Sequence, residues 1–295
     1  MSIAVIGAGK WGQALHYALS QNTPCKITSR QHKELQNFVA LESALGCEYL
    51  IFALPAQVVR GWLKEHFVFS GQKVLVAAKG IEQGSGAFLN EIFAEYIPEN
   101  HLAFLSGPSF ASEVIQGLPT AVVINATNEL LAKEFSLFFP SFIKTYTSTD
   151  VVGAEVCGAY KNVLAIASGI CDGLKLGNNA RASLIARGLV EMHRFGKYFG
   201  AHDETFLGLS GAGDLFLTAS STLSRNYRVG LFLAEGMKIE DILVMLGEVA
   251  EGVFTSKAIF DITNKHTIYT PIAREIALIL EGKEPRMSVR DLLSD

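Results

Sequence analysis

The candidate catalytic and ligand-binding residues lie within or beside apolar and glycine-rich stretches of this chain. Gly7-Ala8-Gly9-Lys10-Trp11-Gly12 has the spacing G-x-G-x-x-G, after the apolar run 3–6 and before a helical pattern from Gly12 to Leu19. In that setting the first glycine permits a tight turn and the second lets backbone approach a pyrophosphate. The third lets the helix pack closely on the strand. The segment therefore predicts dinucleotide binding rather than an ordinary strand–helix turn.

The end of the second apolar run, Cys25 to Ser29, bears on which dinucleotide is bound. The chain continues Thr28-Ser29-Arg30, where a site for the ribose 2′-hydroxyl of NAD has a carboxylate. The nearest acid, Glu34, falls in a segment whose pattern predicts a helix. An arginine and a serine can instead hold a 2′-phosphate, although a solvated arginine stacked on adenine is the alternative. We expect NADP or NAD, with NADP favoured.

Two lysines occupy positions where a charge needs a partner. Lys79 follows the apolar run 74–78, at a strand end of the kind where open α/β sheets bind ligands. Judged from its position alone, a lysine at a strand end more commonly reaches solvent than binds a ligand. Lys161, followed by Asn162, interrupts a small and apolar stretch from Val151 to Cys171. Such a charge is costly unless it is paired or used. Lys161 is therefore a candidate general acid or base, against the alternative of a helix-edge lysine reaching solvent.

Three further segments combine turn residues with polar side chains. Asp214 lies at a glycine turn before an apolar helix, where it could cap the helix or orient an ammonium group. Ser224-Arg225-Asn226 precedes the amphipathic run 229–233, so it could receive a phosphate; a plain serine N-cap with solvated neighbours fits equally well. The segment from Ser106 to Ala111 resembles a strand end turning into a helix, and alone it is only a turn signal.

The elements that must position these residues change character near residue 148. Before it, apolar runs alternate with helical patterns, which indicates a mostly parallel, doubly wound sheet covered on both faces. After it, the periodicity is helical almost throughout. We expect an α/β Rossmann domain over residues 1–148 and an all-α domain over residues 149–295. The expected strands are 3–6, 25–29, 50–54, 73–78, 102–105, 120–124 and 142–146, and the expected helices include 12–19, 31–45, 57–66, 182–199, 239–246 and 271–280.

Composition argues against several classes of protein. The net charge is −4 and the pI about 6.0, without a basic run, so we expect neither nucleic acid nor an anionic membrane surface as a partner. No apolar run reaches the roughly 20 residues of a bilayer span, and the N-terminus lacks a signal-peptide pattern, so we expect a cytoplasmic protein. The four cysteines and seven histidines lack metal-ligand spacing, so we expect reduced thiols and no metal site.

Taken together, these segments resemble the bacterial NAD(P)-dependent glycerol-3-phosphate dehydrogenase family. The matching pieces occur in family order and cover almost the whole chain; they are Gly7–Leu15, Ala78-Lys79-Gly80, Ser106–Ala111, Lys161-Asn162, Asn178-Asn179-Ala180-Arg181, Gly213-Asp214-Leu215 and Ser224-Arg225-Asn226. The resemblance implies reversible hydride transfer between NAD(P)H and dihydroxyacetone phosphate, giving sn-glycerol 3-phosphate for glycerophospholipid synthesis, in a homodimer. The helical domain would be of the 6-phosphogluconate dehydrogenase C-terminal-like type.

The resemblance also implies roles for individual residues. Lys161 would exchange the proton of the substrate C2 oxygen, Lys79 would orient and polarise that oxygen, and Asp214 would support the lysines. The implied substrate-binding residues are Lys79, Gly107, Ser109, Asn162, Asp214, Thr218, Ser224, Arg225 and Asn226. The implied cofactor-binding residues are Gly7, Gly9, Lys10, Trp11, Gly12, Arg30, Lys79, Ala111, Arg225, Val249 and Glu251. Hydride transfer of this kind needs no metal.

One departure from the family and two alternatives qualify this interpretation. Between Arg30 and Leu50 the chain is shorter than the family pattern and lacks its asparagine-aromatic-leucine-proline segment, in the region that borders the adenosine pocket of the family. A sibling two-domain dehydrogenase acting on a 2-hydroxy or keto acid would also fit, because arginine binds carboxylates as well as phosphates. A non-catalytic NADP-responsive regulator would need the glycine loop, but not Lys79, Lys161, Asp214 and Arg225 together.

Overall fold

The computed structural model describes residues 2–247 and 250–294, which form two compact units. Unit 1 consists of Met1–Lys79 and Leu89–Glu155, and unit 2 of Gly80–Phe88 and Val156–Asp295. These units differ from the expected division at 148/149 in two respects. The segment Gly80–Phe88 belongs with the second half of the chain, and the first unit extends to Glu155.

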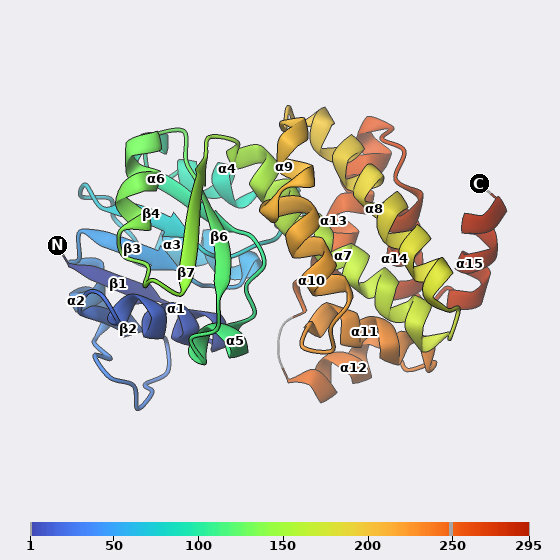
Figure 1. The fold of residues 1–295 in the computed structure, drawn as a ribbon, viewed down its shortest axis with the longest axis horizontal. Helices are drawn as coiled ribbons and strands as arrows, with labels where there is room; N and C mark the ends of the chain where they lie inside the picture. The colour runs from blue at the N-terminus through green and yellow to red at the C-terminus, as the bar shows by residue number, and fades with distance from the viewer. Residues whose placement is uncertain (1, 248–249, 295) are drawn as a thin grey trace. The chain divides into compact units, whose positions relative to one another are not determined.

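Unit 1 is built on a seven-stranded sheet with the order β2-β1-β3-β4-β5-β6-β7 (Figure 1). The strands are β1 (Ile3–Ile6), β2 (Cys25–Thr28), β3 (Tyr49–Phe52), β4 (Lys73–Val76), β5 (Leu102–Ser106), β6 (Thr120–Asn125) and β7 (Ile143–Ser148). Neighbouring strands are parallel except β5 and β6. Ile6 pairs with both Thr28 and Phe52, and Phe52 pairs with Val76. The C-terminal ends of strands β1 to β4 are therefore in register, on the same side of the sheet.

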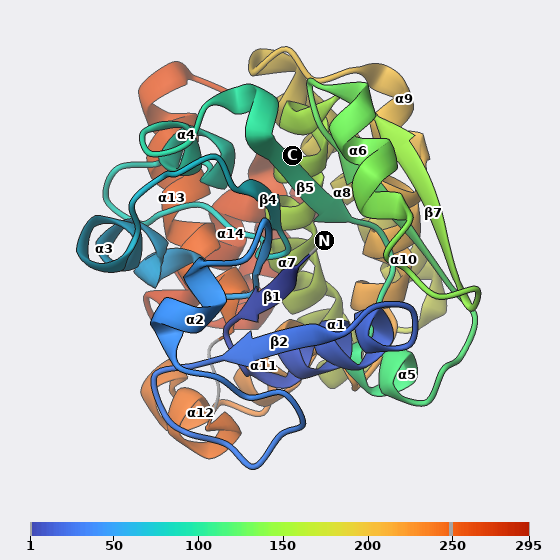
Figure 2. The same cartoon turned by 90° about the vertical axis from the view of Figure 1, so that its left-hand side faces the viewer.

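Helices cover both faces of this sheet (Figure 2). They are α1 (Lys10–Ser20), α2 (Leu41–Leu45), α3 (Ala56–His66), α4 (Leu89–Ala94), α5 (Ala111–Ile115) and α6 (Glu129–Ser136), with a 3₁₀ turn η1 (Glu99–His101). Helices α1, α5 and α6 share one buried cluster with the sheet. On the other face, the ring of Phe52 contacts Trp62 of α3 and Phe93 of α4 at centroid distances of 5.4 and 5.2 Å. The expected doubly wound, mostly parallel sheet is confirmed.

The segment after β2 differs from the sequence-based expectation. A helix over 31–45 is wrong, because only Leu41–Leu45 is helical and residues 31–40 form a loop beside the edge strand β2. The N–H of Ile27 donates to the carbonyl of Asn37 at 3.1 Å, and the N–H of Val39 donates to the carbonyl of Ile27 at 2.9 Å. Asn37 has φ 56°, a left-handed conformation that asparagine tolerates. The open edge of the sheet thus takes the backbone hydrogen bonds that a helix would have made internally.

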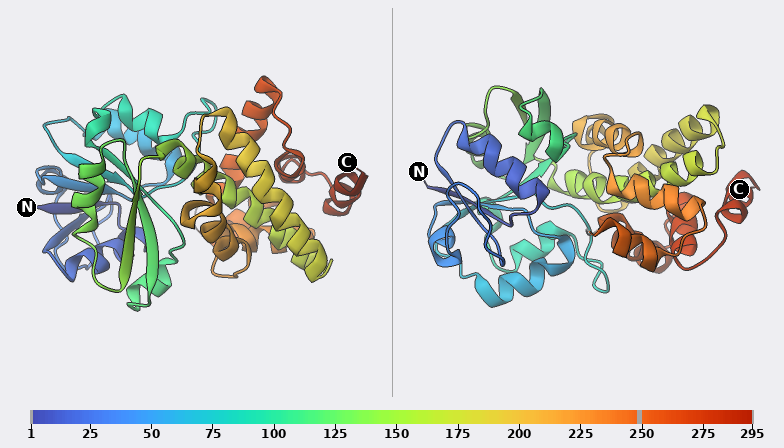
Figure 3. Two further views of the ribbon diagram at one scale, coloured as in Figure 1. Left: turned by 45° about the horizontal axis from the view of Figure 1, so that its top comes forward. Right: turned by 90° about the horizontal axis from the view of Figure 1, so that it is seen from below.

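Within residues 156–247 and 250–294 the secondary structure of unit 2 is helical (Figure 3). Its helices are α7 (Val151–Gly173), which begins in unit 1, α8 (Asn178–Tyr198), α9 (Asp203–Leu207), a π-helical turn η2 (Leu209–Gly213), α10 (Asp214–Ala219), α11 (Arg225–Ala234), α12 (Ile239–Leu246), α13 (Glu251–His266), α14 (Pro271–Leu280) and α15 (Pro285–Ser294). Small residues bring α7 and α11 close together. A Cβ at Gly169 would lie 2.0 Å from the carbonyl oxygen of Tyr227, and one at Gly230 would lie 2.1 Å from that of Ile166. The expected all-helical second half is confirmed.

Candidate active site

The glycine loop after β1 has the shape that a pyrophosphate needs. Gly7 has φ +108°, and a Cβ there would lie 2.7 Å from the carbonyl oxygen of Ala53. A Cβ at Gly12 would lie 1.8 Å from the carbonyl oxygen of Gly7, whereas one at Gly9 would meet nothing within 4 Å. Gly7 and Gly12 are therefore required by close backbone approach, and Gly9 leaves open space in front of the first turn of α1. Open space beside helix N–H groups fits a dinucleotide phosphate.

Trp11 and Lys10 begin the helix that follows this loop. The indole Nε1–H of Trp11 donates to the carbonyl of Ala77, just after β4, at 3.1 Å. This bond ties the start of α1 to the end of β4, two strands away from β1, and so fixes the direction of the helix N-terminus. The helix begins at Lys10 rather than at Gly12, which places both residues in its first turn.

The segment after β2 carries two cations, Arg30 and Lys33, and no carboxylate directly follows the strand. Arg30 is exposed, and the hydroxyl of Ser29 donates to the carbonyl of Gln31 at 2.7 Å. Glu34 is exposed on the loop rather than placed on a helix. Lys33 lies closer to the loop, because its Nζ donates to the carbonyl of Ala8 at 2.7 Å. Sequence reasoning missed Lys33 because it placed this residue on a helix; the shortened segment after β2 was the available signal.

Lys79, Gly107 and Ser109 come together beyond the ends of β4 and β5. The Nζ of Lys79 donates to the carbonyl of Gly107 at 3.3 Å, and the hydroxyl of Ser109 donates to the same carbonyl at 3.2 Å. Gly107 has φ +99°, and a Cβ there would lie 3.2 Å from the carbonyl oxygen of Ala121. A side chain at Gly107 would therefore strain the turn that brings the two donors together. Ala111 begins α5 one turn later.

A buried carboxyl group close to Lys79 was not foreseen. Glu155 on α7 is only 6% exposed, and it accepts hydrogen bonds from the backbone N–H groups of Leu89 and Asn90 at the start of α4. Burial raises its pKa to about 8, while those two N–H groups and the charge of Lys79 oppose the rise. The signal was a glutamate inside the same apolar stretch that drew attention to Lys161.

Lys161, Asp214 and Thr218 form a buried cluster in unit 2. The Nζ of Lys161 lies 2.6 Å from Oδ1 of Asp214 and 3.1 Å from Oγ1 of Thr218. The hydroxyl of Thr218 also donates to Oδ1 of Asp214 at 3.3 Å. The side chains of the ion pair are 10% and 2% exposed, so each charge needs the other to offset the cost of leaving water. The alternative interpretation of Lys161, as a lysine reaching solvent at a helix edge, does not fit this burial and pairing.

The residues expected to receive a phosphate lie at the start of α11. Ser224 caps this helix, and its Oγ accepts the N–H of Tyr227 at 3.3 Å. Asn226 is buried, and its Oδ1 accepts the N–H of Gly252 in the first turn of α13 at 3.0 Å. Arg225 is exposed.

The first turn of α13 also contacts α7. A Cβ on Gly252 would lie 2.8 Å from both the carbonyl oxygen of Asn162 and Oδ1 of Asn226, so the three residues meet there. Glu251 is the first residue of α13, and the predicted cofactor residue Val249 lies outside the described residues.

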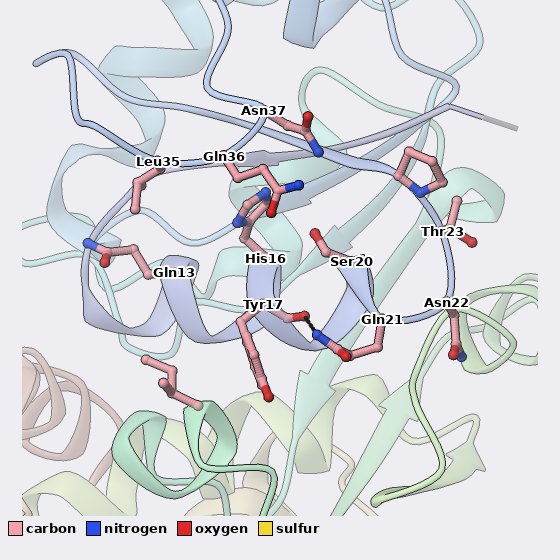
Figure 4. Close-up of a pocket in the computed structure, with 12 residues that line it drawn as sticks. Gln13, His16, Tyr17, Ser20, Gln21, Asn22, Thr23, Leu35, Gln36 and Asn37 are labelled. Atoms are coloured by element: carbon pink, nitrogen blue, oxygen red, sulfur yellow. Dashed lines mark hydrogen bonds between the residues drawn. The ribbon is translucent and has the colours of Figure 1, made fainter.

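One pocket of unit 1 lies elsewhere and is lined by none of the predicted site residues. Figure 4 shows it along α1 and the loop after β2, with a volume of about 600 Å³. Its wall is formed by Gln13, His16, Tyr17, Ser20, Gln21, Asn22, Thr23, Pro24, Leu35, Gln36, Asn37 and Ile115. Burial lowers the pKa of His16, whose Nε2 lies 3.0 Å from the carbonyl of Cys25. The pocket is therefore neutral and rich in amides, without the cations that phosphate binding requires.

The part of the chain that the structure describes contains no cluster of three His, Cys, Asp or Glu side chains able to hold a metal. Cys25, Cys47, Cys157 and Cys171 are all buried and not in disulfides. Among the described helices, none has both the length and the hydropathy needed to cross a membrane.

Comparison with known proteins agrees with the resemblance inferred from the motifs. Models described as the N-terminus and C-terminus of NAD-dependent glycerol-3-phosphate dehydrogenase match residues 30–132 and 150–290. The curated glycerol-3-phosphate dehydrogenase (NAD(P)+) of Sulfurimonas denitrificans is 62% identical over 99% of both chains, and that of Campylobacter jejuni is 61% identical over the same shares. A crystal structure of the Coxiella burnetii glycerol-3-phosphate dehydrogenase has 32% identity and a TM-score of 0.91, covering 100% of this chain and 99% of that one. The chain belongs to the NAD-dependent glycerol-3-phosphate dehydrogenase family.

Proposed function

We propose that this chain catalyses reversible hydride transfer between NAD(P)H and dihydroxyacetone phosphate, giving sn-glycerol 3-phosphate. The observation that carries the proposal is the ion pair of Lys161 with Asp214, buried in a chain of this family. A buried ammonium held by one carboxylate and one hydroxyl has a fixed position, which suits a group that must exchange a proton with a single substrate oxygen.

Lys161 is the proposed acid and base. In reduction, its ammonium gives a proton to the C2 oxygen of dihydroxyacetone phosphate while C2 receives the hydride that the bound nicotinamide supplies. In the reverse direction the neutral amine takes the proton of the C2 hydroxyl. Asp214, at 2.6 Å, stabilises the ammonium form in both directions and holds Nζ in place. Lys79 is proposed to polarise the same oxygen, with Gly107 and Ser109 shaping that side of the substrate.

Ser224, Arg225, Asn226 and Asn162 are proposed to receive the substrate phosphate. Arg225 can make two parallel charged hydrogen bonds to it, and the capped first turn of α11 supplies N–H groups. Asn226 is already oriented by the N–H of Gly252.

The cofactor is NADP or NAD, and we propose that NADP is preferred. Lys33 donates to the carbonyl of Ala8 in the glycine loop, Arg30 is exposed just after β2, and the strand is not followed directly by the carboxylate that would bind a free ribose 2′-hydroxyl. A 2′-phosphate compensates cations there, whereas a hydroxyl does not. We also propose, on the resemblance alone, a cytoplasmic homodimer that supplies glycerophospholipid synthesis.

The deciding experiment is oxidation of NADPH and of NADH by the purified protein with dihydroxyacetone phosphate, beside unphosphorylated dihydroxyacetone. Rapid oxidation that requires the phosphate supports both the reaction and the receptor. Oxidation with a 2-hydroxy or keto acid partner instead would identify a sibling dehydrogenase. Binding of NADPH without any oxidation would support the alternative of a non-catalytic NADP-responsive regulator. Such a regulator would not need the buried Lys161–Asp214 pair.

A further inference from the structure

Three side chains at one end of the helical unit form a connected cluster that the proposed chemistry does not use. Oδ2 of Asp172, near the end of α7, accepts hydrogen bonds from the hydroxyl of Tyr227 at 2.5 Å and from the guanidinium Nη1 of Arg181 at 2.8 Å. The guanidinium Nη2 of Arg181 also donates to Oδ1 of Asn178 at 3.2 Å. We call Asp172, Arg181 and Tyr227 the Asp172 cluster.

The Asp172 cluster joins three helices at their ends. Asp172 is in the last turn of α7, Arg181 is in the first turn of α8, and Tyr227 is in the first turn of α11. Tyr227 is only 7% exposed. Burial, followed by the hydrogen bond to Asp172, raises its pKa to about 12, so its hydroxyl stays a donor throughout the range in which an enzyme works.

Tyr227 follows directly after Arg225 and Asn226, so a bond made by its side chain acts on the turn that carries them. The backbone N–H of Tyr227 is the donor to the capping Ser224, and the hydroxyl of the same residue binds Asp172. Tyr227 is therefore fixed at both ends. First turns of helices are the parts that fray most readily, and a receptor loses affinity when its turn must be ordered on binding.

We infer that the Asp172 cluster positions the phosphate receptor, with Arg181 and Asp172 holding the Tyr227 hydroxyl and so the first turn of α11. The inference rests on the proposed function, because it takes Arg225 and Asn226 as the receptor. The close contact of α7 with α11 at Gly169 and Gly230 keeps the helix body in place without this bond. Losing the hydroxyl should therefore loosen the receptor turn rather than unfold the helix.

The test compares Tyr227→Phe with Tyr160→Phe. Both variants remove one tyrosine hydroxyl bonded to a carboxylate within unit 2, because the hydroxyl of Tyr160 donates to Oε1 of Glu191 at 2.7 Å. Only Tyr227 belongs to the receptor helix. We expect Tyr227→Phe to raise the KM for dihydroxyacetone phosphate about tenfold, with kcat changed less than about twofold. The preference for dihydroxyacetone phosphate over dihydroxyacetone should fall by a similar factor, and Tyr160→Phe should leave both quantities unchanged.

Two further variants separate the possible failures. Arg181→Lys keeps the charge but loses the two-pronged bonding to Asp172 and Asn178, so it should raise the same KM. If Arg225→Ala leaves this KM unchanged, the receptor assignment itself is wrong. If Arg225→Ala raises KM while Tyr227→Phe does not, the receptor stands and the positioning role is overturned. A fall in kcat with both substrates, or equal effects in Tyr160→Phe, would show a general structural role and would also overturn it.

Discussion

Replacing Glu155 by glutamine should stabilise unit 1, and should do so more at high pH than at low pH. The carboxyl group is buried, and its folded pKa is about 8 against 4.5 in an unfolded chain, chiefly because burial disfavours its charge. A raised acid pKa contributes stability that is complete below pH 4.5 and is lost as pH rises towards 8. Glutamine resembles the protonated acid in shape and cannot ionise, so it should not show this loss.

The size of the effect follows from the two pKa values. Each pH unit between the two pKa values lowers the unfolding free energy of the wild-type protein by ~1.4 kcal/mol. The total loss reaches ~3 kcal/mol at pH 7 and ~5 kcal/mol above pH 8. Glu155→Gln should therefore match wild type near pH 4.5 and exceed it by about these amounts at higher pH. The backbone N–H groups of Leu89 and Asn90 keep an acceptor, because the amide oxygen of glutamine can replace the carboxyl oxygen.

Urea unfolding followed by tryptophan fluorescence measures this difference in the correct unit. Both tryptophans, Trp11 and Trp62, belong to unit 1, as Glu155 does. Unfolding would be measured at pH 5 and pH 8.5 for wild type, Glu155→Gln and the exposed control Glu99→Gln, which should alter stability by less than about 0.5 kcal/mol. A gain in Glu155→Gln that is equal at both pH values would refute the reasoning, and so would a loss at pH 8.5. Either result would mean that Glu155 ionises without cost, compensated by Lys79 and the N–H groups.

The remaining predictions concern the proposed chemistry. Lys161→Ala should lower turnover about 10²-fold or more, as loss of a general acid does, while NADPH binding measured by fluorescence titration stays intact; normal turnover would remove Lys161 from the mechanism. Arg225→Ala should weaken the binding of dihydroxyacetone phosphate by about 1.5–3 kcal/mol, measured as a rise in its KM in steady-state kinetics. Lys33→Ala should raise the Kd for NADPH about tenfold and leave that for NADH unchanged, with Lys26→Ala as the matched control on β2. Equal losses for both cofactors would contradict a 2′-phosphate contact. Arg30→Asp should shift the ratio of NADPH to NADH rates towards NADH, and an unaltered ratio would exclude that arginine from cofactor choice.

Periodicity and glycine spacing carried the fold prediction because both reflect local constraints. The alternation of apolar runs with helices predicted the doubly wound sheet, and the helical second half followed from the change of period after residue 148. The loop over residues 31–40 was mispredicted because its backbone hydrogen bonds go to the edge of β2. A tertiary partner of that kind leaves no periodic signal in the sequence.

The candidate site was predictable where a polar residue stood out against its neighbours. Lys161 was found this way, and its partner Asp214 was suspected from a glycine turn. Glu155 interrupts the same apolar stretch but was overlooked, since its acceptor role depends on N–H groups of residues 89 and 90, far away in sequence. The Asp172 cluster was also beyond sequence reasoning, because its three residues approach only after three helix ends have folded together.

The assignment of Gly80–Phe88 to unit 2 has a consequence for synthesis on the ribosome. Phe88 contacts the rings of Phe195 and Phe199 at centroid distances of 6.5 and 5.1 Å, and a Cβ on Gly86 would lie 3.3 Å from the side chain of Ile262. Because chains emerge from their N-terminus, this short segment leaves the ribosome long before the helices it completes. The ring of Phe88 therefore stays exposed to solvent while more than a hundred later residues are synthesised. A fragment that begins after residue 149 would lack this piece altogether and would expose the aromatic surface that Phe88 covers.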